Sequence, residues 1–389
     1  MATHRRPVVR TGLSFDDVLL VPKLSRADSR RDVRLDTRLA PGITLALPII
    51  SANTPWCTEA AMAAEMARLG GCGFIHRMQP VADQVRMVAE VKAVAVDAAR
   101  SPVATTDATG SLLAGAAIGV KDDYLLRAEA LVAAGADVLL VDIAHGHSAQ
   151  ALAALEKVKS EHPGVPVIAG NVATAEGTRA LVEAGADAVK VGIGPGGICT
   201  TRQVAGAGVP QVTAVLDCAE EAAATGTPVI ADGGVRSSGD MVKALAAGAS
   251  AVMLGSMLAG ADESAAVLIE RDGRRYKITT GFVTLGVPLT LKKAGGQEIT
   301  QEDLEDYVAE GVEATFEHRG GLAALLKQYA GGIRSGLSYS GALGIAELWE
   351  QAEFVQVSSA GLGENKPHAL DRAPQLHPDY RTEFLAGKR

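Results

Sequence analysis

The sequence predicts an α/β protein whose eight parallel strands close into a (β/α)8 TIM barrel. Short β-branched runs bounded by glycine occur eight times, and most are separated by amphipathic stretches of helical period. Strands and helices that alternate at this spacing form parallel strands joined by right-handed crossovers. The triplet Ala-Gly-Ala precedes three of the strands, at Gly135, Gly185 and Gly248. An open doubly wound sheet is the alternative arrangement of the same units.

The eight strands are expected in order along the first two thirds of the chain. Their predicted ranges are 48–54, 71–77, 115–120, 138–144, 167–173, 188–194, 229–234 and 251–257. Amphipathic stretches such as 124–133 and 175–184 predict the helices between them. Active sites of this fold lie at the carboxyl ends of the strands, so the residues that follow each strand are the candidates for function.

Two stretches interrupt the alternation. Residues 98–111 predict a small polar linker between the second and third units. Residues 271–320 follow the eighth strand as an insertion, with a charged hairpin-like piece at 271–277 and a helix-prone acidic run at 300–310. A long excursion over the strand ends is often a lid or flap, and an exposed insertion without a role is the alternative.

Length and composition fit one catalytic barrel domain over residues 1–389, although two domains are also compatible with them. The net charge of -8 argues against nucleic-acid and anionic-membrane partners, which require a concentrated basic face. The four cysteines show neither a close pair nor metal-type spacing. No run of about eighteen apolar residues and no signal-like apolar region occurs, so we expect a soluble cytoplasmic protein.

The cysteine loop, residues 191–202, is the most informative segment and reads Val-Gly-Ile-Gly-Pro-Gly-Gly-Ile-Cys-Thr-Thr-Arg. Its glycines at 192, 194, 196 and 197 permit positive φ and close backbone approach, and free N–H groups there can cradle an anion. An ordinary thiol is mostly protonated at neutral pH, so Cys199 needs activation to act as a nucleophile. A thiolate that bonds to an electrophilic carbon divides one difficult displacement into two steps. The alternative is a structural cysteine after a strand.

Polar residues recur at the predicted strand ends. They are Asn53, His76, Asp142, His145, Asn171, Cys199, Asp232 and Ser256. Each alone could be a turn or cap residue, and their shared placement is what predicts a site. Asp232-Gly233-Gly234 and Gly255-Ser256 add backbone donors and a hydroxyl at the seventh and eighth loops, where barrels commonly bind phosphate. Asp232 itself suits ribose hydroxyls, as an acceptor.

Proton transfer needs a further pair of groups. Thr201 lies two residues after the cysteine and could hydrogen-bond a leaving or attacking group. Glu310, at the end of the acidic run, is the candidate that would exchange the proton with Thr201. An ordinary surface glutamate is the alternative interpretation of Glu310.

These segments together resemble the inosine monophosphate dehydrogenase and GMP reductase family. Six motifs occur in the family's order, at residues 12–22, 141–148, 169–174, 191–202, 230–236 and 253–260. The resemblance covers nearly the whole chain. It implies that Cys199 attacks C2 of a purine nucleotide monophosphate and that a hydride passes between C2 and NAD or NADPH. The two reactions share a thioimidate intermediate. In the dehydrogenase, water hydrolyses it to XMP. In the reductase, it forms when GMP loses ammonia.

The resemblance also implies roles for individual residues. Those implied to hold the nucleotide are Gly197, Asp232, Gly234, Gly255, Ser256, Gly281 and Gly311. Those implied to face the cofactor are Asp142, Asn171, Gly192 and Gly194. Thr201 and Glu310 would relay protons beside the catalytic Cys199. Family members are usually homotetramers, and their dehydrogenases bind potassium on backbone carbonyls that correspond to those of Gly194, Gly196 and Cys199.

Departures from the family pattern favour the reductase. The short linker at 98–111 stands where most dehydrogenases carry a tandem regulatory module, so control through that module should be absent. Between Gly281 and Glu310 there is no adjacent arginine and tyrosine, the pair whose arginine activates water in the dehydrogenases. Residues 141–148 and 358–368 are closer to the dehydrogenase branch, which keeps IMP dehydrogenase as the alternative. A nucleotide-binding pseudoenzyme or sensor is the third class.

The expected base pocket also departs from the family. Thr54 and Pro55 replace a methionine and an aspartate, and Gly197 replaces a serine. Thr279 or Thr280, with Phe282, replace a tyrosine and a methionine around Gly281. These changes predict altered base recognition, such as reduction of a modified purine nucleotide.

Overall fold

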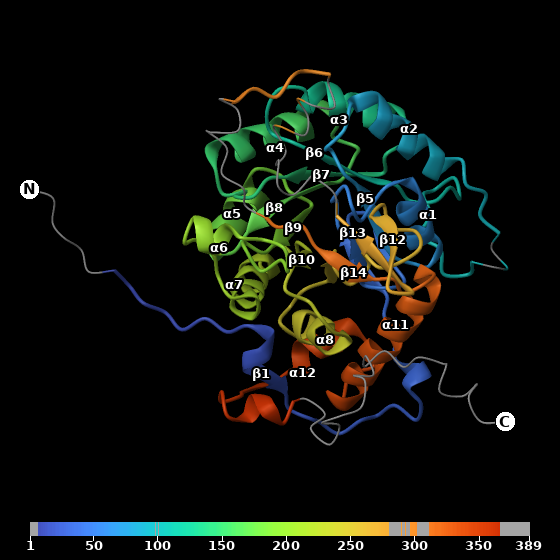
Figure 1. Cartoon of the computed structure of the whole chain (residues 1–389). Helices are drawn as coiled ribbons and strands as arrows, with labels where there is room; N and C mark the ends of the chain where they lie inside the picture. The colour runs from blue at the N-terminus through green and yellow to red at the C-terminus, as the bar shows by residue number, and fades with distance from the viewer. Residues whose placement is uncertain are drawn as a thin grey trace, which may run out of the picture.

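The computed structural model describes residues 7–97, 99, 101–279, 289, 292, 296–301 and 311–365. Eight parallel strands form a closed barrel, in which each strand pairs with the next in sequence and the last pairs with the first (Figure 1). They are β4 (Ile49–Ser51), β5 (Cys72–Ile75), β6 (Gly115–Ile118), β7 (Val138–Asp142), β8 (Val167–Val172), β9 (Ala188–Val191), β10 (Val229–Asp232) and β11 (Ala251–Leu254). The predicted (β/α)8 barrel is confirmed, and the open sheet is excluded because β11 closes onto β4.

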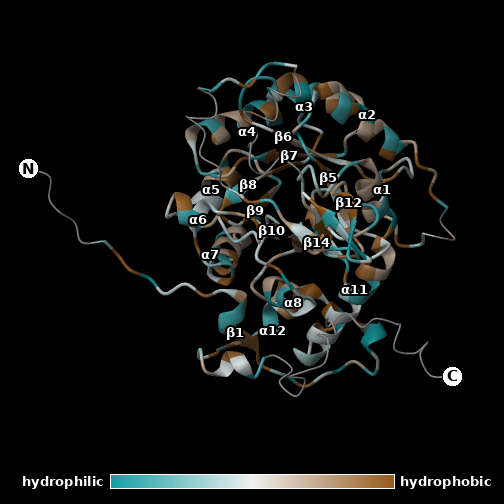
Figure 2. Ribbon diagram, viewed as in Figure 1, coloured by the Kyte–Doolittle hydropathy of each residue, from teal (hydrophilic) through white to brown (hydrophobic). Residues whose placement is uncertain are grey.

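Helices surround the barrel. They are α1 (Ala60–Arg68), α2 (Val81–Lys92), α3 (Tyr124–Ala133), α4 (Ala149–Glu161), α5 (Ala175–Glu183), α6 (Thr201–Val204), α7 (Gln211–Ala223) and α8 (Ser238–Ala246). In Figure 2 the helices of this ring carry both hydrophobic and hydrophilic residues, as expected when one face packs on the strands and the other meets water. None of the described helices combines the length and apolar character needed to cross a membrane.

Two apolar clusters result from the alternation of side chains along the strands. Leu139 and Val141 point outward to the helices, whereas Val138 and Leu140 point into the barrel. The hairpin of β2 (Thr37–Ala40) and β3 (Ile43–Leu45) contributes to the inner cluster and packs with the first residues of several strands. It therefore covers the amino end of the barrel and leaves the carboxyl end for the loops.

The repeated Ala-Gly-Ala segments have a structural explanation at the amino end. Asp137, just before β7, accepts hydrogen bonds from Ala114 N at 2.7 Å and from Lys92 Nζ at 2.8 Å. Asp187, just before β9, repeats this arrangement with Val167 N and Lys159 Nζ, both at 2.7 Å. Gly135 and Gly185 have φ +97, and the lysine stems lie within 3.4 Å of where a Cβ would be. The positive φ favours glycine at both positions, and the lysine stems pack directly over them.

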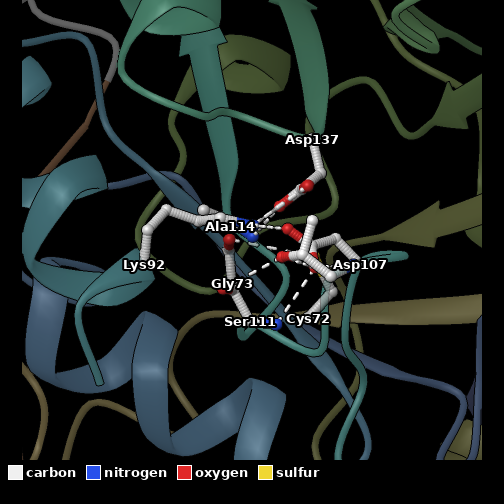
Figure 3. Close-up of polar contacts among 8 residues, drawn as sticks. Cys72, Gly73, Lys92, Asp107, Ser111, Ala114 and Asp137 are labelled. Atoms are coloured by element: carbon white, nitrogen blue, oxygen red, sulfur yellow. Dashed lines mark hydrogen bonds and ion pairs between the residues drawn. The ribbon is translucent and has the colours of Figure 1, made fainter. Parts of the chain in front are cut away.

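The linker predicted at 98–111 is attached to the first of these clusters. Asp107 accepts a hydrogen bond from Lys92 Nζ at 2.7 Å, beside Asp137 (Figure 3). Ser101 and Thr105 are buried, and Thr106 forms a backbone bridge with Leu112. A segment that is polar in sequence is thus packed against the barrel.

Further elements extend the barrel after β11. The hairpin expected at 271–277 comprises β12 (Val267–Arg271) and β13 (Arg274–Ile278), so it begins earlier, and β14 (Thr315–Glu317) joins it as a third strand. The sequence pattern predicts no element after residue 320, where the structure has α11 (Leu322–Tyr339), α12 (Ile345–Gln351) and β15 (Phe354–Gln356). β15 pairs with β1 (Val18–Leu20) and joins the two ends of the described chain.

Glycines in α11 explain how this helix packs, and they provide a test of the fold. A Cβ on Gly336 would lie 2.5 Å from a methyl group of the buried Val242 in α8, whereas a Cβ on Gly331 would meet nothing within 4 Å. Both alanine substitutions gain helix propensity of about 1 kcal/mol. Gly336→Ala also incurs an overpacking cost of about 1–3 kcal/mol.

We therefore expect Gly336→Ala to have a lower free energy of unfolding than Gly331→Ala, measured by urea denaturation. The propensity gain is common to both variants, so their difference isolates the packing cost. Equal unfolding free energies would contradict the contact between α8 and α11.

Candidate active site

Three loops at the carboxyl end of the barrel come together, those that follow β9, β10 and β11. A Cβ on Gly197 would lie 3.4 Å from Ser256 Oγ, and one on Gly233 would lie 3.2 Å from Gly196 N. Gly234, with φ +79, packs against Pro195 of the cysteine loop. The glycines that are predicted to bind phosphate follow separate strands, yet they lie together at one site.

Cys199 lies in this place and is half-buried. Its Sγ is 3.1 Å from Thr201 Oγ1, and its backbone N donates to Gly196 O. The other three cysteines are buried, and burial raises their thiol pKa values, for Cys57 to about 11 and for Cys218 to about 12. Since the thiolate is the reactive form, Cys199 is the cysteine placed to react.

The segment that follows the predicted Glu310 also reaches the cysteine loop. Gly311 forms an isolated antiparallel bridge with Cys199, and Val312 N donates to Ile198 O at 3.0 Å. Gly281 and Glu310, predicted from the insertion, lie outside the described residues, as do Thr280 and Phe282 of the expected base pocket. Their roles stay predictions.

A buried lysine that sequence analysis missed joins the predicted cofactor and ribose residues. Lys190 is 3% exposed, and its Nζ lies 2.9 Å from Asp142 Oδ1 and 2.6 Å from Asp232 Oδ2. Asn171 Nδ2 donates to the same Asp232 oxygen at 2.9 Å and to Gly192 O at 2.7 Å. The available signal was a lysine inside the apolar strand Ala188–Val191, where a charge needs buried partners.

Charge pairing governs ionisation in this network. Burial by itself raises the pKa of Asp142, but Lys190 and Arg77 outweigh it and hold that pKa below its ordinary value. Burial also lowers the pKa of Lys190, and Asp142 and Asp232 reverse this, so the ammonium is held well above its ordinary pKa. The network therefore keeps the Asp142 carboxylate and the Lys190 ammonium ionised at neutral pH.

Two further residues contact Asp142: Asn53, which the sequence predicts at this end of the barrel, and Arg77, which the sequence analysis missed. The Asn53 side chain hydrogen-bonds its carboxylate, and Arg77 donates to its backbone oxygen at 3.3 Å. His76, predicted at the same end, is 3% exposed, and its Nδ1 accepts from Met78 N. The loops after β4 and β5 therefore hold the Asp142 end of the network.

Buried polar atoms without a hydrogen-bond partner gather at this end of the barrel. Among the described residues they are Thr54 Oγ1, His76 Nε2, Arg77 Nε, Asn171 Oδ1 and Gln211 Oε1, together with Thr105 Oγ1 in the linker. Buried polar groups are costly when unpaired, so such atoms mark places where a ligand or water completes the bonding. A carboxamide has the donor that Asn171 Oδ1 lacks and the acceptor that Arg77 Nε lacks.

Gly192 and Gly194 have a structural requirement of their own. A Cβ on Gly192 would lie 2.0 Å from Asp232 O, and one on Gly194 would lie 2.6 Å from Arg202 Cγ. Both have positive φ, at +149 and +76. Packing of the chain on itself therefore explains these glycines, and their contact with a cofactor stays a prediction.

Comparisons with known proteins agree with this arrangement. A family model described as IMP dehydrogenase / GMP reductase domain matches residues 12–368. An inosine-5'-monophosphate dehydrogenase from Nitrosopumilus maritimus is 39% identical, covering 92% of this chain and 98% of the relative. A GMP reductase from Leishmania donovani is 36% identical, covering 94% and 98%. Both alignments span more positions than the 389 residues here, so these relatives contain residues without a counterpart in this chain.

A solved structure is also similar. It is a cysteine-to-alanine variant of GMP reductase from Trypanosoma brucei in complex with guanosine 5'-monophosphate. The TM-score is 0.86 at 34% identity, with 92% of this chain and 98% of that chain covered.

Proposed function

Since the chain belongs to the IMP dehydrogenase / GMP reductase family of oxidoreductases, we propose that it catalyses NADPH-dependent reductive deamination of GMP, or of a modified GMP analogue, to IMP. The observation that carries this proposal is Cys199 beside Thr201 and next to Gly311, with no Arg-Tyr pair between residues 281 and 310 to activate water. Deamination needs a group that protonates the leaving ammonia, whereas hydrolysis needs a base for water.

Cys199 would supply the nucleophile. Its thiolate bonds to C2 of the purine, the C2–N bond breaks, and ammonia leaves with a proton relayed from Glu310 through Thr201. The chemistry that NADPH would supply when bound is a hydride for C2. Cys199 would then leave C2 as the thiolate when the C2–S bond breaks, which would release IMP. Gly197, Gly234, Gly255 and Ser256 would hold the phosphate, and Asp232 the ribose.

The Lys190 network would orient the cofactor side. Lys190, Asn53 and Asp232 already hold Asp142 and Asn171 in place, which is the preorganisation that a cofactor site would use. The carbonyls of Gly194, Gly196 and Cys199 could take a potassium ion, although Gly196 O already accepts one bond from Cys199 N. Potassium, a homotetramer and a cytoplasmic location stay predictions from the resemblance.

One assay tests the proposal. Purified protein with GMP and NADPH should consume the reduced cofactor and release ammonia in equal amounts. Formation of NADH from IMP and NAD would instead establish the dehydrogenase, the alternative that the Nitrosopumilus maritimus relative and residues 141–148 favour. Silence in both assays, with measurable nucleotide binding, would indicate a sensor or another base.

Thr201→Val should slow turnover by about 10²- to 10⁴-fold, because it removes the hydroxyl that relays the proton. Nucleotide affinity, measured by calorimetry, should change little because the glycine loops and Ser256 are intact. Thr200→Val, one residue earlier, is the matched control. If Thr201→Val turns over at close to the rate of the unsubstituted protein, Thr201 does not relay the proton.

A further inference from the structure

Trp56 lies in the loop after β4, at the carboxyl end of the barrel, yet it is only 6% exposed. Its ring stacks on Phe316 of β14, with centroids 5.6 Å apart and planes 24° from parallel. The same ring covers Gly255, since a Cβ on that glycine would lie 2.9 Å from Trp56 Cη2. One side chain therefore contacts both a predicted nucleotide loop and the strand that returns from the insertion.

The loop that carries Trp56 is held by hydrogen bonds. Thr54 O accepts from Cys57 N at 2.9 Å and from Thr58 N at 3.1 Å. Thr58 Oγ1 donates to Ala52 O at 2.7 Å and also lies 2.9 Å from Ser51 Oγ. Trp56 is thus fixed to β4, a strand of the barrel, and can act as a rigid support.

Residues 311–317, here called the return segment, are fixed at both ends. At the first end Gly311 and Val312 pair with the backbone of Cys199 and Ile198. At the other end Phe316 stacks on Trp56 and pairs with Lys277 of β13. The return segment therefore spans the distance between the reactive thiol and Trp56.

We propose that Trp56 is a positioning residue, which sets the return segment against the cysteine loop and the Gly255–Ser256 loop. The aromatic stack fixes Phe316, and the short segment transmits that placement to the backbone pair at Cys199. The effect on turnover rests on the proposed function, because the return segment begins directly after Glu310. The effect on Cys199 itself does not depend on that function.

Two rates test this role in the full-length protein. Trp56→Leu should lower kcat by about tenfold to a hundredfold, with a much smaller change in nucleotide affinity, because misplacement acts on the reacting groups. It should also speed alkylation of Cys199 by iodoacetamide, since the other three cysteines are buried and the backbone pair over Cys199 is loosened. Trp56→Phe keeps an aromatic ring, so its kcat and its alkylation rate should both lie close to those of the unsubstituted protein. Trp349→Phe, at the only other tryptophan, is the matched control and should leave both unchanged.

The outcomes separate the two proposals. If the unsubstituted protein does not turn over GMP with NADPH, the proposed reaction on GMP fails, and the alkylation rates still decide the role of Trp56. If Trp56→Leu is folded, with unsubstituted kcat and alkylation rate, the role of Trp56 is refuted. Should Trp56→Leu not fold, Phe316→Leu removes the stack from the other side and must give the same two changes. Unchanged rates in Phe316→Leu would also refute the role.

Discussion

Cys199→Ala is expected to lower turnover by at least about a thousandfold, in whichever direction the reaction runs, because the covalent route is lost. Nucleotide affinity should remain, since the predicted phosphate contacts come from Ser256 and from glycines of three loops that the substitution leaves in place. Initial rates from cofactor absorbance, together with calorimetric titration of GMP and IMP, measure the two quantities separately.

Cys218→Ala is the matched control for this prediction. Cys218 is fully buried in α7, where its Sγ contacts Thr174 O at 3.5 Å, so the substitution should lower stability and leave turnover in place. Turnover by Cys199→Ala at a rate near that of Cys218→Ala would refute the covalent mechanism. The family assignment would stand, but the chemistry would need another nucleophile.

Lys190→Met is expected to be the most destabilising single change in the site. It leaves the carboxylates of Asp142 and Asp232 near each other with their shared ammonium removed. Breaking a buried ion pair by removing one partner costs about 3–5 kcal/mol. Urea denaturation at pH 7 measures this loss, and Lys157→Met, at an exposed lysine of α4 that pairs with Glu161, is the control that should change little.

The pH dependence of this loss has a definite sign. The pKa of Asp142 is lowered by folding, so its charge stabilises the protein above its unfolded pKa, and this contribution is lost as the pH falls. The pKa of Lys190 is raised, so its contribution is complete below its unfolded pKa and is lost as the pH rises through the folded value. The ion pairs of Lys190 therefore make their full contribution to the free energy of unfolding between about pH 4 and about pH 10.

In Lys190→Met only Arg77 and Asn53 still oppose the burial that raises the pKa of Asp142, so we expect that pKa to rise. The destabilisation should then be largest near neutral pH and smaller at pH 5. Adding Asp142→Asn to Lys190→Met removes one unpaired carboxylate and should recover part of the stability. A loss that is independent of pH, or no recovery in the double variant, would contradict the electrostatic explanation.

The sequence was sufficient for the barrel because local signals repeat. Each strand is a short apolar run, and the Ala-Gly-Ala segments mark turns whose φ only glycine adopts easily. It was insufficient for α11, where Gly331, Gly332 and Gly336 lower the helix propensity, and contact with α8 is what stabilises the helix. Tertiary packing overrides the local preference there.

What the sequence by itself determined is the set of chemical groups and their order: the (β/α)8 barrel, the candidate nucleophile Cys199, and the glycine loops at the strand ends. What only the tertiary structure decided is which of these groups touch. Lys190 forms ion pairs with both Asp142 and Asp232, and Trp56 contacts both Phe316 and Gly255. These residues are far apart in the sequence. The physical reason is that the period of a strand fixes which face a side chain takes, whereas its partner depends on barrel closure, which brings strand ends together without leaving a local pattern.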